Sequence, residues 1–170
     1  MRICFVAPTT HLSGNVTTAE RICALLQQAG HDVLQIAPSD MASTTGKEFD
    51  CCFYLHALRC GSVVWKSTDP SIRAKKYVLI LGGTDANEKH HADSEAEMLR
   101  VVETSDSIVC FSDAMVAAAL SKWGDCARSK LVVISQSIAP CPNDHSEVTL
   151  DSLVGGTSPV VLLPAGLRPV

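Results

Sequence analysis

Apolar runs and amphipathic stretches alternate along most of the chain, and this alternation predicts strands and helices in turn. The first apolar run, "RICFVA", predicts a strand at 2–7 that ends at Pro8. The helix that follows is predicted to begin with a capping box between Thr17 and Glu20 and to end at Gly30. Its apolar face consists of Ala19, Ile22, Cys23, Leu26 and Ala29.

Further apolar runs predict strands at 32–38, 49–58, 77–81, 107–111 and 130–136. The run "FDCCFYLHAL" at 49–58 is apolar on both faces, as expected for a central strand of a parallel sheet. Between these strands, the sequence predicts a short helix broken at Pro70 within 62–76 and a polar loop at 82–91. It also predicts a helix at 94–105, capped by Ser94 and Glu97, and a helix at 112–124 that ends at Gly124. Strands that alternate with helices predict an α/β fold with a doubly wound parallel sheet.

The composition changes after residue 138. Residues 139–159 are rich in proline, glycine and polar side chains, which predicts a linker or an exposed connection. The run "VVLLPAGLRPV" at 160–170 then predicts another buried strand. We therefore expect one domain at 1–138 and, at 160–170, the first strand of a second domain that is cut short.

Composition and charge exclude several classes of protein. Apolar residues make up 46% of the 170 residues, which indicates a globular protein. The net charge is −4 and the 14 basic residues do not cluster, so an electrostatic grip on nucleic acid is not expected. No apolar run is long enough for a membrane span or a signal peptide. The 8 cysteines are scattered without a C-x-x-C pair, and we expect buried, reduced thiols in a cytoplasmic protein.

Candidate binding residues lie in loops that follow the predicted strands. In an open parallel sheet, ligands bind beyond the carboxyl ends of the strands, so these loops share one edge. Gly14 and Asn15 close the first loop, where free helix N–H groups suit a phosphate or a sugar hydroxyl. Taken alone, that loop favours a plain strand-to-helix turn over a binding site. His56 ends the third strand and is either an acid, a base or a hydroxyl ligand, or a structural histidine.

The stretch "GGTDANE" follows the fourth strand. Its glycines open the backbone, and Asp85 and Asn87 are able either to bind substrate hydroxyls or to cap the next helix. The pair His90–His91 with Asp93 lacks a third ligand at a metal-binding spacing, so no metal site is expected. The sequence contains no G-x-S-x-G, P-loop or G-x-G-x-x-G, which disfavours a serine hydrolase, a P-loop protein and an ordinary dehydrogenase.

Several stretches together resemble the amino-terminal half of the two-domain retaining glycosyltransferases of the glycogen-synthase-like superfamily, which have the GT-B fold. They are "MRICFVAP", "SGNVTTAERICALLQQAGHDV", "LHALRCG", "LILGGTDANE", "SIVCFSDAM" and "LLPAGLRPV", in that order. The resemblance implies that 1–138 is a Rossmann-like, acceptor-side domain facing a donor-binding domain. It also implies sugar transfer from a nucleotide-sugar co-substrate to an acceptor, without metal or other cofactor.

The resemblance also assigns roles to individual residues. Gly14 matches the loop that approaches the donor diphosphate, and His56 falls near the cleft between the two domains. Gly83, Thr84 and Asp85 match a strand-four motif that often reads His-Gly-Thr-Asp, with Gly82 at the histidine position. Arg168 matches an arginine that contacts donor phosphates, and Ser137 precedes the crossover to the second domain. His56 and Asp85 are the catalytic candidates.

Three interpretations of function follow from the sequence. The first is a glycosyltransferase that lacks activity as a chain of this length, because most of the donor site would lie beyond residue 170. The second is a non-catalytic isoform or fragment that binds a partner, with its final strand pairing with another chain. The third, which the missing glycine fingerprint disfavours, is a stand-alone flavodoxin-like or NAD-binding domain.

Overall fold

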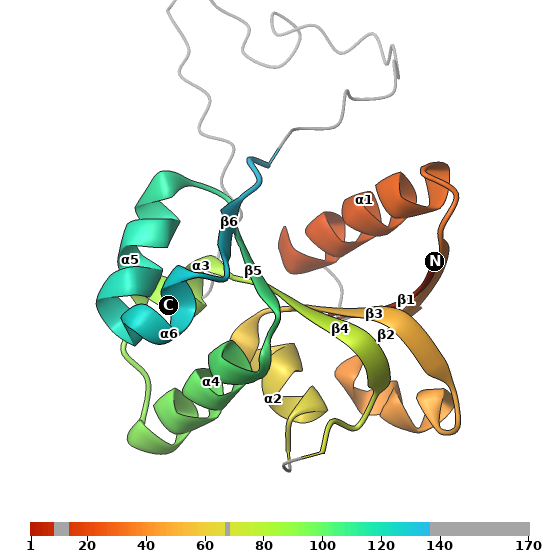
Figure 1. Cartoon of the computed structure of the whole chain (residues 1–170), viewed down its shortest axis with the longest axis horizontal. Coiled ribbons are helices and arrows are strands. Elements are labelled where there is room, and N and C mark those ends of the chain that lie inside the picture. The colour runs from red at the N-terminus through yellow and green to blue at the C-terminus, as the bar shows by residue number, and fades with distance from the viewer. Residues whose placement is uncertain (9–13, 67–68, 137–170) are drawn as a thin grey trace, which may run out of the picture. The chain divides into compact units, whose positions relative to one another are not determined.

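Six parallel strands form a single sheet in the computed structural model, which describes residues 1–8, 14–66 and 69–136 (Figure 1). The strands are β1 (Arg2–Val6), β2 (Asp32–Ile36), β3 (Glu48–Leu55), β4 (Arg73–Ile80), β5 (Ser107–Cys110) and β6 (Leu131–Val133). Their order across the sheet is β2-β1-β3-β4-β5-β6, and every neighbouring pair is parallel. The predicted doubly wound α/β fold is confirmed.

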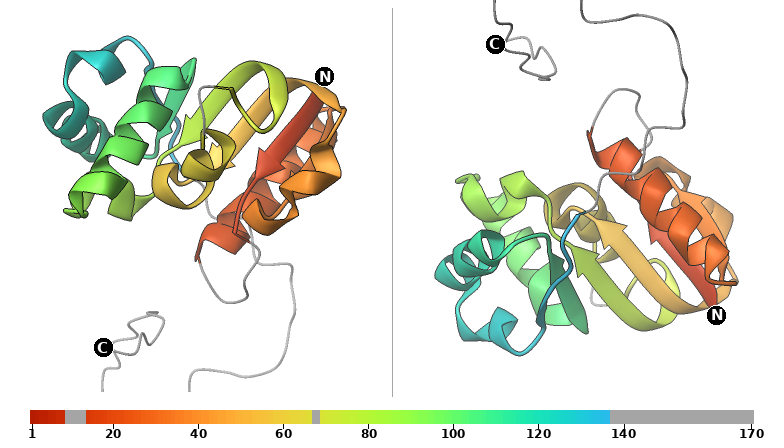
Figure 2. Two further views of the ribbon diagram at one scale, coloured as in Figure 1. Left: turned by 90° about the horizontal axis from the view of Figure 1, so that it is seen from below. Right: turned by 90° about the horizontal axis from the view of Figure 1, so that it is seen from above.

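Helices cover both faces of this sheet, as the views from below and above show (Figure 2). Helix α1 lies on one face and packs through Ala19 and Cys23. Helices α2, α4, α5 and α6 contribute to the apolar cluster on the other face. The helical segments are α1 (Gly14–Gln28), η1 (Pro38–Thr44), η2 (Ala57–Gly61), α2 (Ser62–Val64), α3 (Gly83–Asn87), α4 (Ala92–Thr104), α5 (Asp113–Trp123) and α6 (Asp125–Arg128).

Strand β3 lies at the centre of the core because both its faces are apolar. Tyr54 points into the larger apolar cluster and Leu55 into the smaller one beneath α1. Its neighbours are β1 and β4, which leaves no edge exposed to water. The prediction of a central parallel strand from "FDCCFYLHAL" is confirmed, although the strand ends at Leu55 and not at residue 58.

The strand order reverses between β1 and β3. From β1 the chain passes through α1 to β2 on one side, and it then returns to β3 on the other side of β1. Such a switch point leaves a crevice at the carboxyl ends of the two strands, where open α/β sheets bind their ligands. Here β3 delivers His56 to that end of the sheet.

Two capping boxes predicted from the sequence are wrong. Helix α1 begins at Gly14, so Thr17 lies inside it and has no free helix end to cap. Helix α4 begins at Ala92, and His91 occupies the capping position without a side-chain bond. By contrast, Ser112 caps α5 by accepting the Met115 N–H at 3.2 Å. Gly124 ends that helix with a φ of +58°, as glycine permits.

The predicted helix within 62–76 is only partly present. Residues 62–64 are helical, but β4 already begins at Arg73 and pairs with β3 from Glu48 onward. Lys75 and Lys76 interrupt the apolar pattern in this half of β4, so the sequence does not predict a strand there. Their side chains pair with Asp50 and Asp106. The predicted loop at 82–91 contains α3, and the predicted strand at 130–136 is β only at 131–133.

Other predictions concern residues that the structure does not describe. They are the connection at 139–159, the strand at 160–170, Ser137, Arg168 and most of the first loop. None of the helices described is both long and apolar enough to cross a membrane.

Candidate functional site

His56 is held in a strained backbone conformation at the carboxyl end of β3. Its φ is +82° and its ψ is +119°, and among the described residues no other non-glycine side chain has a positive φ. Such a conformation costs on the order of 1–3 kcal/mol and persists only where the surroundings enforce it. The residue is 3% exposed, and its N–H donates to the Ile80 carbonyl at 2.9 Å.

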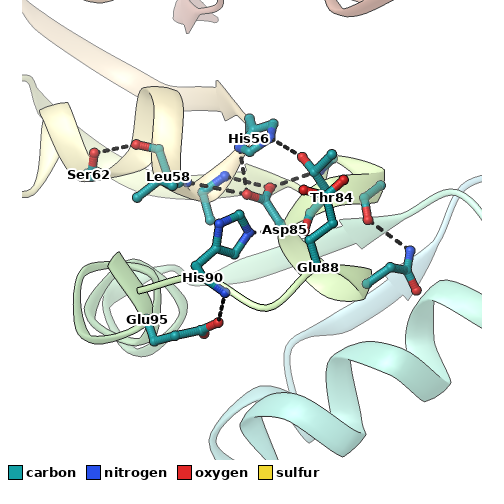
Figure 3. Close-up of polar contacts among 12 residues, drawn as sticks. His56, Leu58, Ser62, Thr84, Asp85, Glu88, His90 and Glu95 are labelled. Carbon is teal, nitrogen blue, oxygen red and sulfur yellow. Dashed lines mark hydrogen bonds and ion pairs between the residues drawn. The ribbon is translucent and has the colours of Figure 1, made fainter. Parts of the chain in front are cut away.

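Asp85 ties together the segments that follow β3 and β4. Its fully buried carboxylate accepts the Ala57 N–H at 2.7 Å and the Gly82 N–H at 3.0 Å. The Leu58 N–H is a longer third donor at 3.4 Å (Figure 3). The first turn of η2 and the start of α3 therefore share one buried anion, whose charge these N–H groups stabilise.

The imidazole of His56 lies between Asp85 and Thr84. Nδ1 is 2.6 Å from Asp85 Oδ1, and Nε2 is 2.6 Å from Thr84 Oγ1. The carboxylate oxygen lies off the axis of the ring N–H, so this is a close electrostatic contact and not an aligned hydrogen bond. An anion so near Nδ1 favours a proton on that nitrogen, which leaves Nε2 to accept the Thr84 hydroxyl.

Two adjacent glycines at the end of β4 serve different purposes. A Cβ added at Gly82 would lie 2.7 Å from His56 Cδ2, so only glycine lets the ring occupy its place. A Cβ added at Gly83 would meet nothing within 4 Å. Gly83 is exposed and Thr84 is half-buried, so a ligand reaches these two residues first and finds His56 behind them.

Helix α5 anchors α3 from outside the cluster. Lys122 Nζ donates to the carbonyls of Asp85 and Glu88 at 2.8 and 3.0 Å, and it pairs with Glu95 at 3.1 Å. His90 Nε2 lies 3.2 Å from the Thr84 carbonyl. The sequence pattern predicted neither contact, and no local signal sets Lys122 apart from the other lysines.

A thiol close to this cluster has no role as a nucleophile. Burial, reinforced by the charge of Asp85, raises the pKa of Cys60 to about 12. The thiol is therefore protonated at neutral pH, whereas a nucleophilic cysteine needs a lowered pKa.

The structure brings some of the predicted site residues together and leaves others apart. His56, Gly83, Thr84 and Asp85 form one cluster, defined here as the His56 cluster. Gly14 and Asn15 lie in a different segment, the first turn of α1. The carboxylate of Asp85 is occupied by protein groups, so this geometry favours a supporting position over direct contact with a ligand.

Of the two remaining predicted residues, one borders the His56 cluster and the other lies outside the described residues. Asn87 is exposed, and its Nδ2 donates to the Gly83 carbonyl at 2.8 Å. Arg168 lies outside the described residues. Within 1–8, 14–66 and 69–136, no group of three or more His, Cys, Asp or Glu side chains is placed to hold a metal ion. His91 and Asp93 instead stand at the start of α4.

The arrangement is suited to recognising and polarising a hydroxyl group. The Thr84 hydroxyl both donates and accepts hydrogen bonds, and the imidazole behind it is a second hydrogen-bonding group within 2.6 Å. Asp85 lies against Nδ1 and fixes the orientation of the ring. These features resemble the acid–base pairs of many enzymes, with the difference that a threonine covers the reactive nitrogen.

Comparison with known proteins finds a distant relative. No family model matches the chain. The chain is 27% identical over 150 residues to glycosyltransferase 1 domain-containing protein 1 of Xenopus tropicalis. The alignment covers 84% of this chain and 41% of the relative, so the chain spans about two fifths of that protein's length.

Proposed function

We propose that this chain supplies the acceptor-side part of a glycosyltransferase that moves a sugar from a nucleotide-sugar to an acceptor hydroxyl. The distant glycosyltransferase relative and the Rossmann-like sheet support this proposal. In it, the sheet is the amino-terminal domain of a GT-B arrangement. The whole reaction needs the opposite wall of the cleft, which lies outside the described residues.

The observation that carries the proposal is the strained, buried His56. A positive φ is unfavourable for a residue with a Cβ, and His56 is the one described non-glycine residue that adopts it. Backbone strain of this kind concentrates at functional sites, where the surrounding contacts enforce it. Here those contacts come from Asp85 and Thr84, which follow β4, while His56 follows β3, one of the two strands of the switch point.

Each residue of the His56 cluster has a role in this proposal. Thr84 and Gly83 contact the bound sugar or the acceptor. The Thr84 hydroxyl donates to His56 Nε2, and its oxygen accepts a hydrogen bond from a hydroxyl of the ligand. Asp85 is a positioning residue, because it touches the ring and the backbone but is itself fully buried. The amino end of α1, near Gly14 and Asn15, suits the departing diphosphate because helix N–H groups and the helix dipole favour an anion there.

The chemical step breaks the bond between the sugar's anomeric carbon and the diphosphate oxygen and forms a bond to the acceptor oxygen. The acceptor's proton leaves with the nucleoside diphosphate or passes to solvent. No metal or organic cofactor enters this scheme, since protein N–H groups and cations stabilise the leaving diphosphate.

The proposal is tested with a panel of UDP-, GDP- and ADP-sugars. Ligand-observed NMR measures their binding to the purified chain, and release of nucleoside diphosphate measures turnover. We expect weak binding of one donor class, lost in His56→Asn and kept in the control His31→Asn, which alters a half-buried histidine before β2.

The outcomes separate the candidate functions. Binding without release of diphosphate supports a binding module, and release of diphosphate supports an active enzyme. If no nucleotide-sugar binds, or if His56→Asn binds as well as the unaltered chain, the proposed function is wrong.

A further inference from the structure

A second cleft lies at the opposite end of the sheet from His56. It has a volume of about 620 Å³ and is lined by the first residues of β1, β3 and β4, with the loops that precede β3 and β4. Because all the strands are parallel, this cleft is at their amino ends. The His56 cluster is at their carboxyl ends, so the two sites share no residue.

Three cations from separate segments line this amino-end cleft. Arg2 begins β1, Lys47 precedes β3 and Arg73 begins β4. Glu48 is the single carboxylate among the lining residues, so their side chains carry a net charge of +2 (three cations less one anion). In a chain whose overall charge is −4, this local excess is a distinct feature.

The cations of the cleft lack the close partners that their neighbours have. On the same strand as Arg73, Lys75 and Lys76 pair with aspartates at 2.7 and 2.8 Å. Within the described part of the chain, neither Lys47 nor Arg73 makes an ion pair, although Lys47 is half-buried. Arg2 is 3.9 Å from Asp32, which is a loose pair.

The guanidinium of Arg2 is held in place by an aromatic ring. It lies 5.3 Å from the centroid of the Phe49 ring, and this cation–π contact restricts its motion. Thr45 adds a hydroxyl group to the lining, whereas the Ser71 hydroxyl donates to the Val63 carbonyl at 3.3 Å. Phosphate recognition uses this combination of guanidinium, ammonium and hydroxyl donors.

We propose that the amino-end cleft binds a small phosphate monoester that also carries hydroxyl groups. Arg2, Lys47 and Arg73 neutralise the phosphate, and Lys47 and Arg73 make no ion pair within the described residues. Glu48 accepts hydrogen bonds from hydroxyls of the same ligand, and the volume leaves room for more than a phosphate group. This binding is independent of the proposed sugar transfer at the His56 cluster.

The test compares inorganic phosphate and glycerol 3-phosphate as ligands, with glycerol as the uncharged control. Isothermal titration calorimetry at low salt measures their affinities for the whole chain. The variant Lys47→Gln with Arg73→Gln removes two cations of the cleft. The matched control, Lys75→Gln with Lys76→Gln, removes two cations from the same strand that are already paired.

We expect the cleft variant to bind both phosphates at least about tenfold more weakly, as the loss of a charged hydrogen bond implies. The control should stay within about twofold, because its charges are neutralised by aspartates. Glu48→Gln should strengthen inorganic phosphate binding and reduce the preference for glycerol 3-phosphate. Arg73 is exposed, so the single variant Arg73→Gln keeps the fold and shows part of the loss.

Two results would overturn this proposal. The first is that neither phosphate binds the unaltered chain. The second is that the control variant weakens binding as much as the cleft variant does, which would indicate unspecific attraction to surface charge.

Discussion

The strain at His56 predicts that a glycine variant is more stable than an alanine variant, which reverses the usual order. At most positions a protein with Gly is less stable than one with Ala by about 0.5–1 kcal/mol, because Gly loses more conformational freedom on folding. At His56 the positive φ penalises every residue with a Cβ. We therefore expect His56→Gly to be more stable than His56→Ala, while both are less stable than the unaltered chain.

The size of this reversal follows from three terms. A ψ of +119° puts His56 outside the small left-handed region, so we take the upper end of the strain range, about 3 kcal/mol. Glycine relieves that strain, but it costs about 1 kcal/mol in backbone entropy. It also removes one buried methyl group, worth about 0.8 kcal/mol. The balance is about 1 kcal/mol in favour of His56→Gly.

Urea unfolding followed by circular dichroism measures this difference. With an m-value of about 1–3 kcal/mol/M, the midpoint of His56→Gly should lie about 0.3–1 M above that of His56→Ala. Ala117→Gly, at an exposed position of α5, is the control and should show the usual loss of about 0.5–1 kcal/mol. If His56→Ala is as stable as His56→Gly or more stable, the backbone is not strained and His56 loses its claim to a functional role.

Other predictions concern the glycine pair, a surface carboxylate and the thiols. Gly82→Ala should cost about 1–3 kcal/mol in urea unfolding, because its Cβ would lie 2.7 Å from the buried imidazole, while Gly83→Ala should change stability little. Burial alone would raise the pKa of Asp106, but bonds from a lysine and a backbone N–H outweigh it and lower that pKa. The stability that this carboxylate contributes is therefore present above its unfolded pKa of about 4 and is lost as the pH falls through the lower folded pKa. In a plot of the urea midpoint against pH, Asp106→Asn should show a smaller decline on the acid side. Alkylation at pH 8, read by mass spectrometry, should label Cys126 before any other described thiol, because the others are buried. Burial also raises the pKa of Cys110 to about 11. Equal labelling of Cys126 and Cys110 in the native chain would contradict this prediction.

The sheet was predictable from the sequence because its strands are short apolar runs with clear polar boundaries. The run at 49–58 is apolar on both faces, and a strand of that kind has no stable place except the middle of a sheet. The start of β4 was not predictable, since Lys75 and Lys76 break the apolar pattern and make sense only beside Asp50 and Asp106. Whether such a polar segment forms a strand depends on its ion pairs with neighbouring segments, and the local sequence does not show those pairs.

The candidate site was predictable in its members but not in their roles. The position of His56 and "GGTDANE" after neighbouring strands placed them at one edge of the sheet. The sequence left Asp85 open as a cap or as a ligand for hydroxyls. Its burial beneath His56 depends on N–H groups of a turn 27 or 28 positions earlier in the chain, which only the folded structure brings near. The same holds for Lys122, whose carbonyl partners lie on α3 and just beyond it.

The most direct test of the proposed function is a map of where a nucleotide-sugar binds. Two-dimensional ¹H–¹⁵N NMR of the labelled chain, titrated with the donor that binds best, reports each backbone amide. We predict that the amides of Ala57, Gly83 and Thr84 shift together, since they surround the His56 ring. Shifts confined to other surfaces, such as the amino-end cleft around Lys47, would contradict the assignment of the His56 cluster as the site that contacts the sugar.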